Sequence, residues 1–246
     1  MTRRPGGGSV RPVRPSGRSG DVARPRLLDL FCGAGGAAMG YHRAGFDVVG
    51  VDVVKQPRYP FPVVQGDALS PPIDLSTFQA IHASPPCQAY SVTRFTHNVV
   101  HPELVEPTRR LLKDSGLPYI IENVVGAPLL DPLELCGATF GLTATDVDGA
   151  PLYLRRHRLF ESNVFMWGPG SPCRCSEPRH AGIQCAGAYG GGPMNRDRDD
   201  KRGGYSPTVA IRRRIMDCDW MTQKEVNQAI PPAYTQFLGE QLLNHI

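Results

Sequence analysis

The chain has 246 residues, 41% of them hydrophobic, and a formal net charge of +4, which suits one α/β domain with a small appendage. No run of about 18 apolar residues occurs, and no apolar stretch follows the basic N-terminus, so neither a membrane span nor a secretory signal is expected. The seven cysteines are odd in number and spread along the chain, which argues against a disulfide framework and for a reducing compartment such as the cytoplasm.

The N-terminal segment is basic and poor in apolar side chains. Residues 1–26 hold seven Arg and one Asp, which leaves about −2 for the rest of the chain. A segment rich in Gly, Pro, Ser and Arg cannot bury enough apolar surface to offset its ordering entropy. We therefore expect residues 1–25 to be a disordered basic tail, either an arm for nucleic acid or a plain solvated terminus.

From Arg26 onward, short apolar runs alternate with stretches of helical spacing. The runs are 27–31, 48–53, 62–64, 80–83 and 119–121, and the helical stretches include 37–44 and 103–113. Buried strands that alternate with helices predict an α/β fold with a doubly wound, mostly parallel, Rossmann-like sheet. Such sheets bind ligands at the carboxyl ends of their strands.

The second half of the chain predicts a small insert within this domain. Residues 154–161 have the pattern of a strand with a basic cluster, and 163–207 are rich in Gly, Pro, Cys and charge. Residues 222–243 return to helical spacing, interrupted by two prolines, and are expected to pack back on the sheet. The predicted division is a main domain of residues 26–162 and 208–246 with a small insert of residues 163–207.

A glycine-rich turn and two acidic residues predict a site for a nucleotide-like cofactor. Gly33, Gly35 and Gly36 follow the first run, where backbone N–H groups can approach a polar ligand closely. The pattern is not G-x-G-x-x-G, so a standard nicotinamide site is not expected. Asp52 ends the second run and can accept hydrogen bonds from ribose hydroxyls, and Asp67 ends the third and can contact an exocyclic amine. A single Asp there is more often a loop or cap residue, so the prediction rests on the ordered set.

A cysteine and a glutamate follow two further runs and suggest nucleophilic chemistry. Cys87 lies in the sequence Pro85-Pro86-Cys87-Gln88, where the prolines fix the backbone of the loop. A buried cysteine is usually a small hydrophobe, but a polar loop that presents it can favour the thiolate. Glu122 comes directly after run 119–121 and could hydrogen-bond a ring nitrogen and pass a proton.

Taken together, these segments resemble the cytosine-C5 DNA methyltransferases over most of residues 26–161, and weakly over 226–243. The resemblance implies S-adenosyl-L-methionine as cofactor, with Phe31 packing against its adenine. Departures include Ala83-Ser84, where Gly-Gly is common, and Asp52, where Glu is more usual. The cofactor residues that the resemblance implies are Asp29, Phe31, Gly33, Gly35, Gly36, Asp52, Asp67 and Pro85.

The same resemblance implies a mechanism in which Cys87 adds to C6 of a cytosine flipped out of the duplex. Glu122 hydrogen-bonds the ring, and Arg156 and Arg158 hold the base and orient the glutamate. The resemblance also implies that residues 26–162 and 208–246 are the catalytic domain and that residues 163–207 are a target-recognition insert. The expected partner is DNA, with no membrane and no obligate protein partner, and the expected state is a monomer. The compact size suits a phage or mobile-element enzyme. An RNA cytosine-5 methyltransferase and a non-catalytic DNA-binding protein with the same fold are the alternatives.

Two features of the insert stay open on the sequence alone. Cys173, Cys175, His180 and Cys185 offer four ligands in a short span, which suits tetrahedral zinc; the alternative is three free thiols and a surface histidine. Residues 196–214 are basic and could follow DNA phosphates, or form a solvated charged loop.

Overall fold

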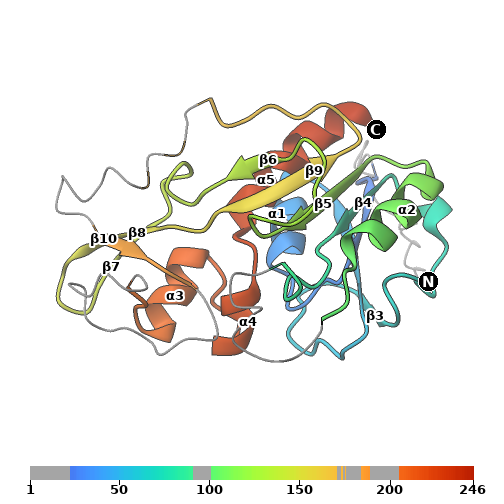
Figure 1. Cartoon of the computed structure of the whole chain (residues 1–246). Coiled ribbons are helices and arrows are strands. Elements are labelled where there is room, and N and C mark those ends of the chain that lie inside the picture. The colour runs from blue at the N-terminus through green and yellow to red at the C-terminus, as the bar shows by residue number, and fades with distance from the viewer. Residues whose placement is uncertain (1–22, 91–100, 171–172, 174, 176–183, 189–204) are drawn as a thin grey trace, which may run out of the picture.

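The structure is a computed structural model that describes residues 23–90, 101–170, 173, 175, 184–188 and 205–246 (Figure 1). Its centre is a seven-stranded sheet in the order β3-β2-β1-β4-β5-β9-β6. The strands are β1 (Arg26–Leu30), β2 (Asp47–Asp52), β3 (Val63–Gln65), β4 (Ala80–Ala83), β5 (Tyr119–Asn123), β6 (Leu133–Leu135) and β9 (Arg158–Ser162).

This strand order follows the Rossmann arrangement with one insertion. The five strands from β3 to β5 are parallel, and β9 runs antiparallel between β5 and β6. The order reverses between β1 and β4, and ligands of open α/β sheets bind beside such a switch point, at the carboxyl ends of the strands. The loops that follow β1, β2, β4 and β5 meet at this edge, which is called the carboxyl edge below.

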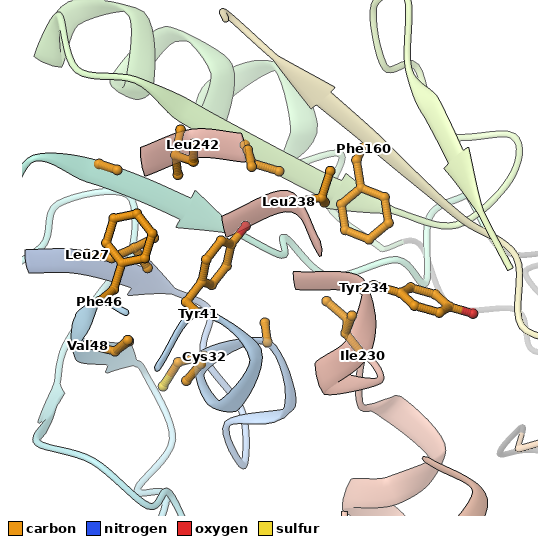
Figure 2. Close-up of a cluster of buried hydrophobic side chains, with 14 of the residues drawn as sticks. Leu27, Cys32, Tyr41, Phe46, Val48, Phe160, Ile230, Tyr234, Leu238 and Leu242 are labelled. Atoms are coloured by element: carbon orange, nitrogen blue, oxygen red, sulfur yellow. The ribbon is translucent and has the colours of Figure 1, made fainter. Parts of the chain in front are cut away.

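Successive residues of a strand point to opposite faces of the sheet. The buried strands therefore present apolar side chains on both faces, and helices cover each face. Leu27 and Ile120 belong to a core that also contains residues of α1 (Gly36–Ala44) and α5 (Pro232–Leu242). Figure 2 shows Leu27 in this core with Tyr41 of α1 and Leu238 of α5. The neighbouring strand residues Leu28 and Ile121 belong to a second core, closed by Leu112 of α2 (Val105–Ser115). Two short 3-10 turns, η1 (Leu75–Thr77) and η4 (Leu243–His245), complete this domain.

A smaller three-stranded sheet lies beside the large one (Figure 1). It contains β7 (Thr143–Thr145), β8 (Pro151–Leu154) and β10 (Gln184–Ala186), and it packs with α3 (Val209–Met216) and α4 (Gln223–Gln228). Its core draws on residues before, within and after the predicted insert, which include Leu152, Leu154, Ala186, Ile211, Ile215 and Val226.

The predicted strand 154–161 is in fact two strands that belong to different sheets. β8 ends at Leu154 and β9 begins at Arg158, and residues 155–157 connect them. The connection is fixed by two hydrogen bonds, in which Arg155 N–H donates to Ala186 O (3.2 Å) and the Tyr234 hydroxyl donates to Arg156 O (2.6 Å). The first bond extends the pairing of β8 with β10 by one residue, and the second ties the connection to α5.

The prediction that residues 196–214 form a flexible basic segment is wrong at its carboxyl end. Residues from Val209 to Met216 form α3, capped by the Thr208 hydroxyl, which accepts from Ile211 N–H. Arg212 is fully buried, and its guanidinium donates to Asn227 Oδ1 (2.5 Å), so this side chain cannot contact phosphate. Residues 196–204 and the predicted tail, up to residue 22, lie outside the described residues.

Within the described residues, no helix has the length and apolar character that crossing a membrane requires.

Candidate active site

The glycine-rich turn lies at the carboxyl edge, between β1 and α1. Phe31, Gly33 and Gly35 have positive φ angles of 57°, 49° and 83°, which glycine adopts without strain and a side chain rarely does. A Cβ on Gly36 would lie 2.4 Å from Ile230 O, so the turn is packed on that side. A Cβ on Gly33 would meet nothing within 4 Å, so the turn is open there. This opening is where a ligand could approach the backbone.

Asp52 fastens the glycine-rich turn to the end of β2. Its Oδ2 accepts from Gly33 N–H (2.9 Å) and its Oδ1 accepts from Val54 N–H (2.9 Å). The carboxylate is partly exposed and keeps further lone pairs, so it can also accept from a ligand hydroxyl. The structure therefore brings together two of the residues that the sequence predicted for the cofactor.

The other two predicted aspartates differ in their surroundings. Asp29 is 1% exposed within β1, and its Oδ2 accepts from the Tyr59 hydroxyl (3.1 Å). Burial raises the pKa of Asp29 to about 8. Because the side chain is buried, the carboxyl is not exposed to a ligand at the open side of the turn. Asp67 is exposed two residues after β3, with its Oδ1 accepting from Leu69 N–H (2.9 Å), and so remains accessible to a ligand.

The donor set at this edge fits S-adenosylmethionine. The cofactor carries a carboxylate that backbone N–H groups of a positive-φ turn can bind, a ribose diol that Asp52 can bind, and an adenine amine that Asp67 can bind. Phe31 is partly buried next to the turn and offers an apolar surface for a base.

The loop that carries Cys87 follows β4 and is tied to the end of β5. Asn123 Nδ2 donates to Pro85 O (2.9 Å), and Pro85 is buried. Tyr90 N–H donates to Cys87 O (3.0 Å), which closes a turn around the half-buried cysteine. Pro85 thus holds the loop through its carbonyl, and the predicted nucleophile and the predicted acid are placed side by side.

Glu122 forms a buried ion pair with Arg158. Arg158 Nε lies 2.9 Å from Glu122 Oε1, and their side chains are 11% and 8% exposed. Ser84 also hydrogen-bonds the Glu122 carboxyl. The pair joins β5 to β9 beside the Cys87 loop.

Charges around Cys87 and Glu122 oppose the effect of burial. Burial raises the pKa of both groups, and the charges of Arg158 and Arg156 counteract this by lowering it. Glu122 in turn raises the pKa of the Cys87 thiol. A thiolate at this position therefore depends on the two arginines and is disfavoured while Glu122 is ionised.

Arg156 acts from within the protein and not from the surface of the site. Its side chain is fully buried, and its guanidinium donates to Ala188 O and to Asn227 O (3.0 Å). These bonds fix the chain on either side of α3. Its effect on Cys87 and Glu122 is electrostatic, so we describe it as a positioning residue.

Three polar residues behind Glu122 were missed in the sequence. Tyr41 Oη lies 3.0 Å from His82 Nδ1, and His82 Nε2 lies 2.9 Å from Ser84 Oγ. His82 is fully buried in β4, and burial lowers its pKa to about 3, so it stays neutral. The chain of hydrogen bonds runs from α1 to the glutamate. The signal was a histidine inside an apolar strand, which by itself resembles a satisfied core residue.

Only part of the predicted zinc set comes together within the described residues. Cys173 and Cys175 lie with Cys136 and His157, and the four ligand atoms are all within 4.8 Å of one another. Cys185 packs against this group without belonging to it. His180 lies outside the described residues.

Comparisons with known proteins agree with this architecture. No protein-family model matches the chain, and no curated protein is similar in sequence. Among solved structures, a protein described as a DNA modification methyltransferase encoded within an E. coli prophage aligns with a TM-score of 0.51 and 14% identity, covering 89% of this chain and 99% of its own. The chain has a Rossmann-like methyltransferase fold.

A second solved structure supports the same conclusion about the fold. The Dnmt2 methyltransferase of S. pombe aligns with a TM-score of 0.53 and 10% identity, covering 91% of this chain and 99% of its own. The predicted fold class is thereby confirmed, and the predicted family resemblance is confirmed at the level of the fold.

Proposed function

We propose that this methyltransferase-fold chain transfers a methyl group from S-adenosylmethionine to C5 of cytosine in DNA. The observation that carries the proposal is the Glu122–Arg158 pair, held against the Cys87 loop at the carboxyl edge. A binding protein has no need of a nucleophile, an acid and an arginine in this arrangement. Similarity to two solved methyltransferases supports it through the fold.

The arrangement answers a chemical difficulty, since C5 of cytosine is a weak nucleophile. The Cys87 thiolate forms a bond to C6, and the Glu122 carboxyl hydrogen-bonds the ring at N3, which draws electron density away and favours the addition. The cofactor, when bound, would supply an electrophilic methyl group to C5, and its sulfur would keep the electrons of the broken S–CH3 bond and leave as S-adenosylhomocysteine. A water-borne base then takes the C5 proton, the bond between sulfur and C6 breaks, and Cys87 is restored.

The target base must leave the duplex to reach Cys87, since C6 is inaccessible to a protein side chain in stacked DNA. We infer that the small sheet and the chain after Cys173 contact the DNA. Leu154, at the end of β8, adjoins the connection to Arg158 at the carboxyl edge. Residues 163–167 are less suited, because Asn163 pairs with Tyr119 at the opposite end of β5 from Glu122 (2.7 Å).

Trapping with 5-fluorocytosine tests the proposal. DNA that contains this base should form a complex that survives denaturation, because fluorine at C5 cannot be lost as a proton. The complex should require S-adenosylmethionine and be absent with Cys87→Ser. Cys185→Ser serves as the matched control and should trap as the wild type does.

Each of three results would reject one part of the proposal: the nucleophile, the DNA substrate or catalysis itself. A complex formed by Cys87→Ser at the wild-type rate would exclude Cys87 as the nucleophile. Methyl incorporation into RNA with none into DNA would favour the RNA alternative. Cofactor-independent DNA binding with no trapped complex and no methylation would favour a non-catalytic protein.

A further inference from the structure

Three cysteine sulfur atoms and one histidine nitrogen meet where the two sheets join. They come from three separate segments: the turn after β6, the connection between β8 and β9, and the chain that follows β9. The residues are Cys136, His157, Cys173 and Cys175. Three are buried or half-buried, and Cys173 is exposed.

The distances suit a tetrahedral metal ion. His157 Nε2 lies 3.3 Å from Cys175 Sγ and 3.4 Å from Cys173 Sγ. A tetrahedral zinc site with bonds of about 2.0–2.3 Å separates its ligand atoms by about 3.5–3.8 Å. The observed spacing is close to that range, so a central ion would need only small shifts of these side chains.

The surroundings of His157 resemble those of a metal-binding histidine. Its Nδ1 lies 3.1 Å from Glu134 Oε1, on the side of the ring opposite to the thiols. With Nδ1–H donating to this carboxylate, Nε2 presents its lone pair to the sulfur atoms. A carboxylate that fixes the tautomer and orientation of a histidine is the usual outer partner of a zinc ligand.

The cysteines are also held in place by the backbone. Cys175 N–H donates to Cys173 Sγ (3.4 Å), and backbone hydrogen bonds from Ala138 and Arg156 reach the thiol of Cys136. The Tyr153 hydroxyl donates to Cys175 O, which ties this part of the chain to β8.

We propose that these four residues bind a structural zinc ion that locks the junction between the two sheets. Three thiolates and an imidazole are a common closed set for zinc, and no ligand position remains for a reacting water. The ligand set differs from the one that the sequence suggested, because Cys136 and His157 take the places of His180 and Cys185.

The position of His157 gives the ion a consequence for the active site. His157 lies between Arg156 and Arg158, whose guanidinium groups reach the chain around α3 and the Glu122 carboxyl respectively. An ion bound to His157 therefore fixes the backbone from which both arginines extend. This consequence rests on the proposed function, whereas the metal site itself does not.

The first test measures metal in protein purified without a histidine tag. Elemental analysis should give about one zinc per chain, the value for a full four-ligand site. Replacement by Co²⁺ should produce the absorption bands of tetrahedral cobalt thiolate. Less than about 0.2 zinc per chain after purification with zinc present, where a full four-ligand site gives about one, would overturn the proposal, as would a disulfide among these cysteines in protein purified with a reductant present.

Variants distinguish the proposed ligand set from the one suggested by the sequence. In competition with a chelator, Cys136→Ser and His157→Gln should each bind zinc with an affinity more than about tenfold weaker than that of the wild type. Cys185→Ser and His180→Gln, the matched controls, should stay within about twofold of the wild type. Unchanged affinity in either ligand variant, or release of zinc from the controls, would overturn the ligand set.

Two further readouts keep this result separate from folding and from activity. The cobalt spectrum of the wild-type protein reports the ligands without any substitution. Circular dichroism of each variant shows whether the sheet is intact. If zinc is present but 5-fluorocytosine trapping fails, the proposed function falls while the metal site stands.

Discussion

Arg158 Nε lies 2.9 Å from Glu122 Oε1, a contact that joins the antiparallel strand β9 to the end of β5. Both side chains are nearly buried, so each is the main compensation for the charge of the other. Because the pair lies beside the Cys87 loop, a change in either residue alters the electrostatic potential at the thiol.

Replacing Glu122 by Gln should slow methyl transfer by about 100-fold or more while leaving the cofactor affinity unchanged. The amide cannot pass a proton to the ring, and general acid catalysis contributes on this scale. Steady-state methylation and calorimetry with the cofactor would measure the two effects. Glu240→Gln, an exposed change on α5, is the control, and wild-type turnover in Glu122→Gln would exclude the acid role.

The pH dependence of Cys87 alkylation should respond in opposite directions to two substitutions. Arg158→Gln should raise the pKa of the thiol, because the arginine lowers it, and Glu122→Gln should lower that pKa. Mass spectrometry of the Cys87 peptide after timed alkylation would give the rate at each pH. Shifts in the same direction would mean that repacking, and not charge, controls the thiol.

Gly33→Ala should lower both the cofactor affinity and the free energy of unfolding, whereas an equivalent change away from the site should lower only the free energy of unfolding. Gly33 has a φ of 49° with open space around a would-be Cβ, so the substitution costs roughly 1–2 kcal/mol of stability through its backbone and places a methyl where the ligand would approach. Gly116, with a φ of 68° and the same open space, ends α2. Gly116→Ala should cost similar stability and leave cofactor affinity unchanged, and equal affinities in both variants would contradict the proposed site.

The sequence was sufficient for four parallel strands of the large sheet because they are short apolar runs that end in distinctive residues, whereas β6 was not predicted and β9 was not separated from β8. The runs 27–31, 48–53, 80–83 and 119–121 correspond to β1, β2, β4 and β5. Here burial on both faces produces a local pattern, and local patterns are what a single sequence shows.

The small sheet and the metal cluster were harder to predict from the sequence, because their contacts join segments that are far apart along the chain. α3 was missed since its three consecutive arginines resembled a solvated loop, although Arg212 is buried through its bond to Asn227. His157 was interpreted only as part of a basic cluster. Its proximity to Cys136 depends on the crossing from β8 to β9, which no spacing in the sequence reveals.

Asp29 should make the protein less stable as the pH rises from about 4 to about 8. Its folded-state pKa is raised to about 8 from an ordinary value of 3.8, so the folded protein binds the proton more tightly and loses that advantage as the proton leaves. The buried His82, whose pKa is lowered to about 3, makes an opposite contribution below about pH 6.5. The measurement is therefore the difference in urea-unfolding free energy between the wild type and Asp29→Asn at each pH, and the wild type should lose stability relative to the variant as the pH rises from about 4 to about 8.

Tyr59→Phe provides the control for this pH effect. The Tyr59 hydroxyl lowers the pKa of Asp29 by donating to it, so its removal should extend the decline to higher pH. A stability difference between the wild type and Asp29→Asn that stays constant between pH 4 and 8 would mean that Asp29 is ionised in the folded protein over this range.

Glu134→Gln should weaken zinc binding by about 10- to 100-fold without removing a ligand, because losses of this size follow when the outer partner of a metal-bound histidine is changed. The amide oxygen can still accept from His157 Nδ1–H, so this variant removes the charge and retains the hydrogen bond, whereas Glu134→Ala removes both and should bind zinc more weakly still. Chelator competition would rank the two variants against the wild type, with Glu240→Gln as an exposed carboxylate far along the chain from the cluster. Glu134 is itself 44% exposed, so the fold should survive either change. Equal zinc affinity in all four proteins would show that the carboxylate does not support His157 as a ligand.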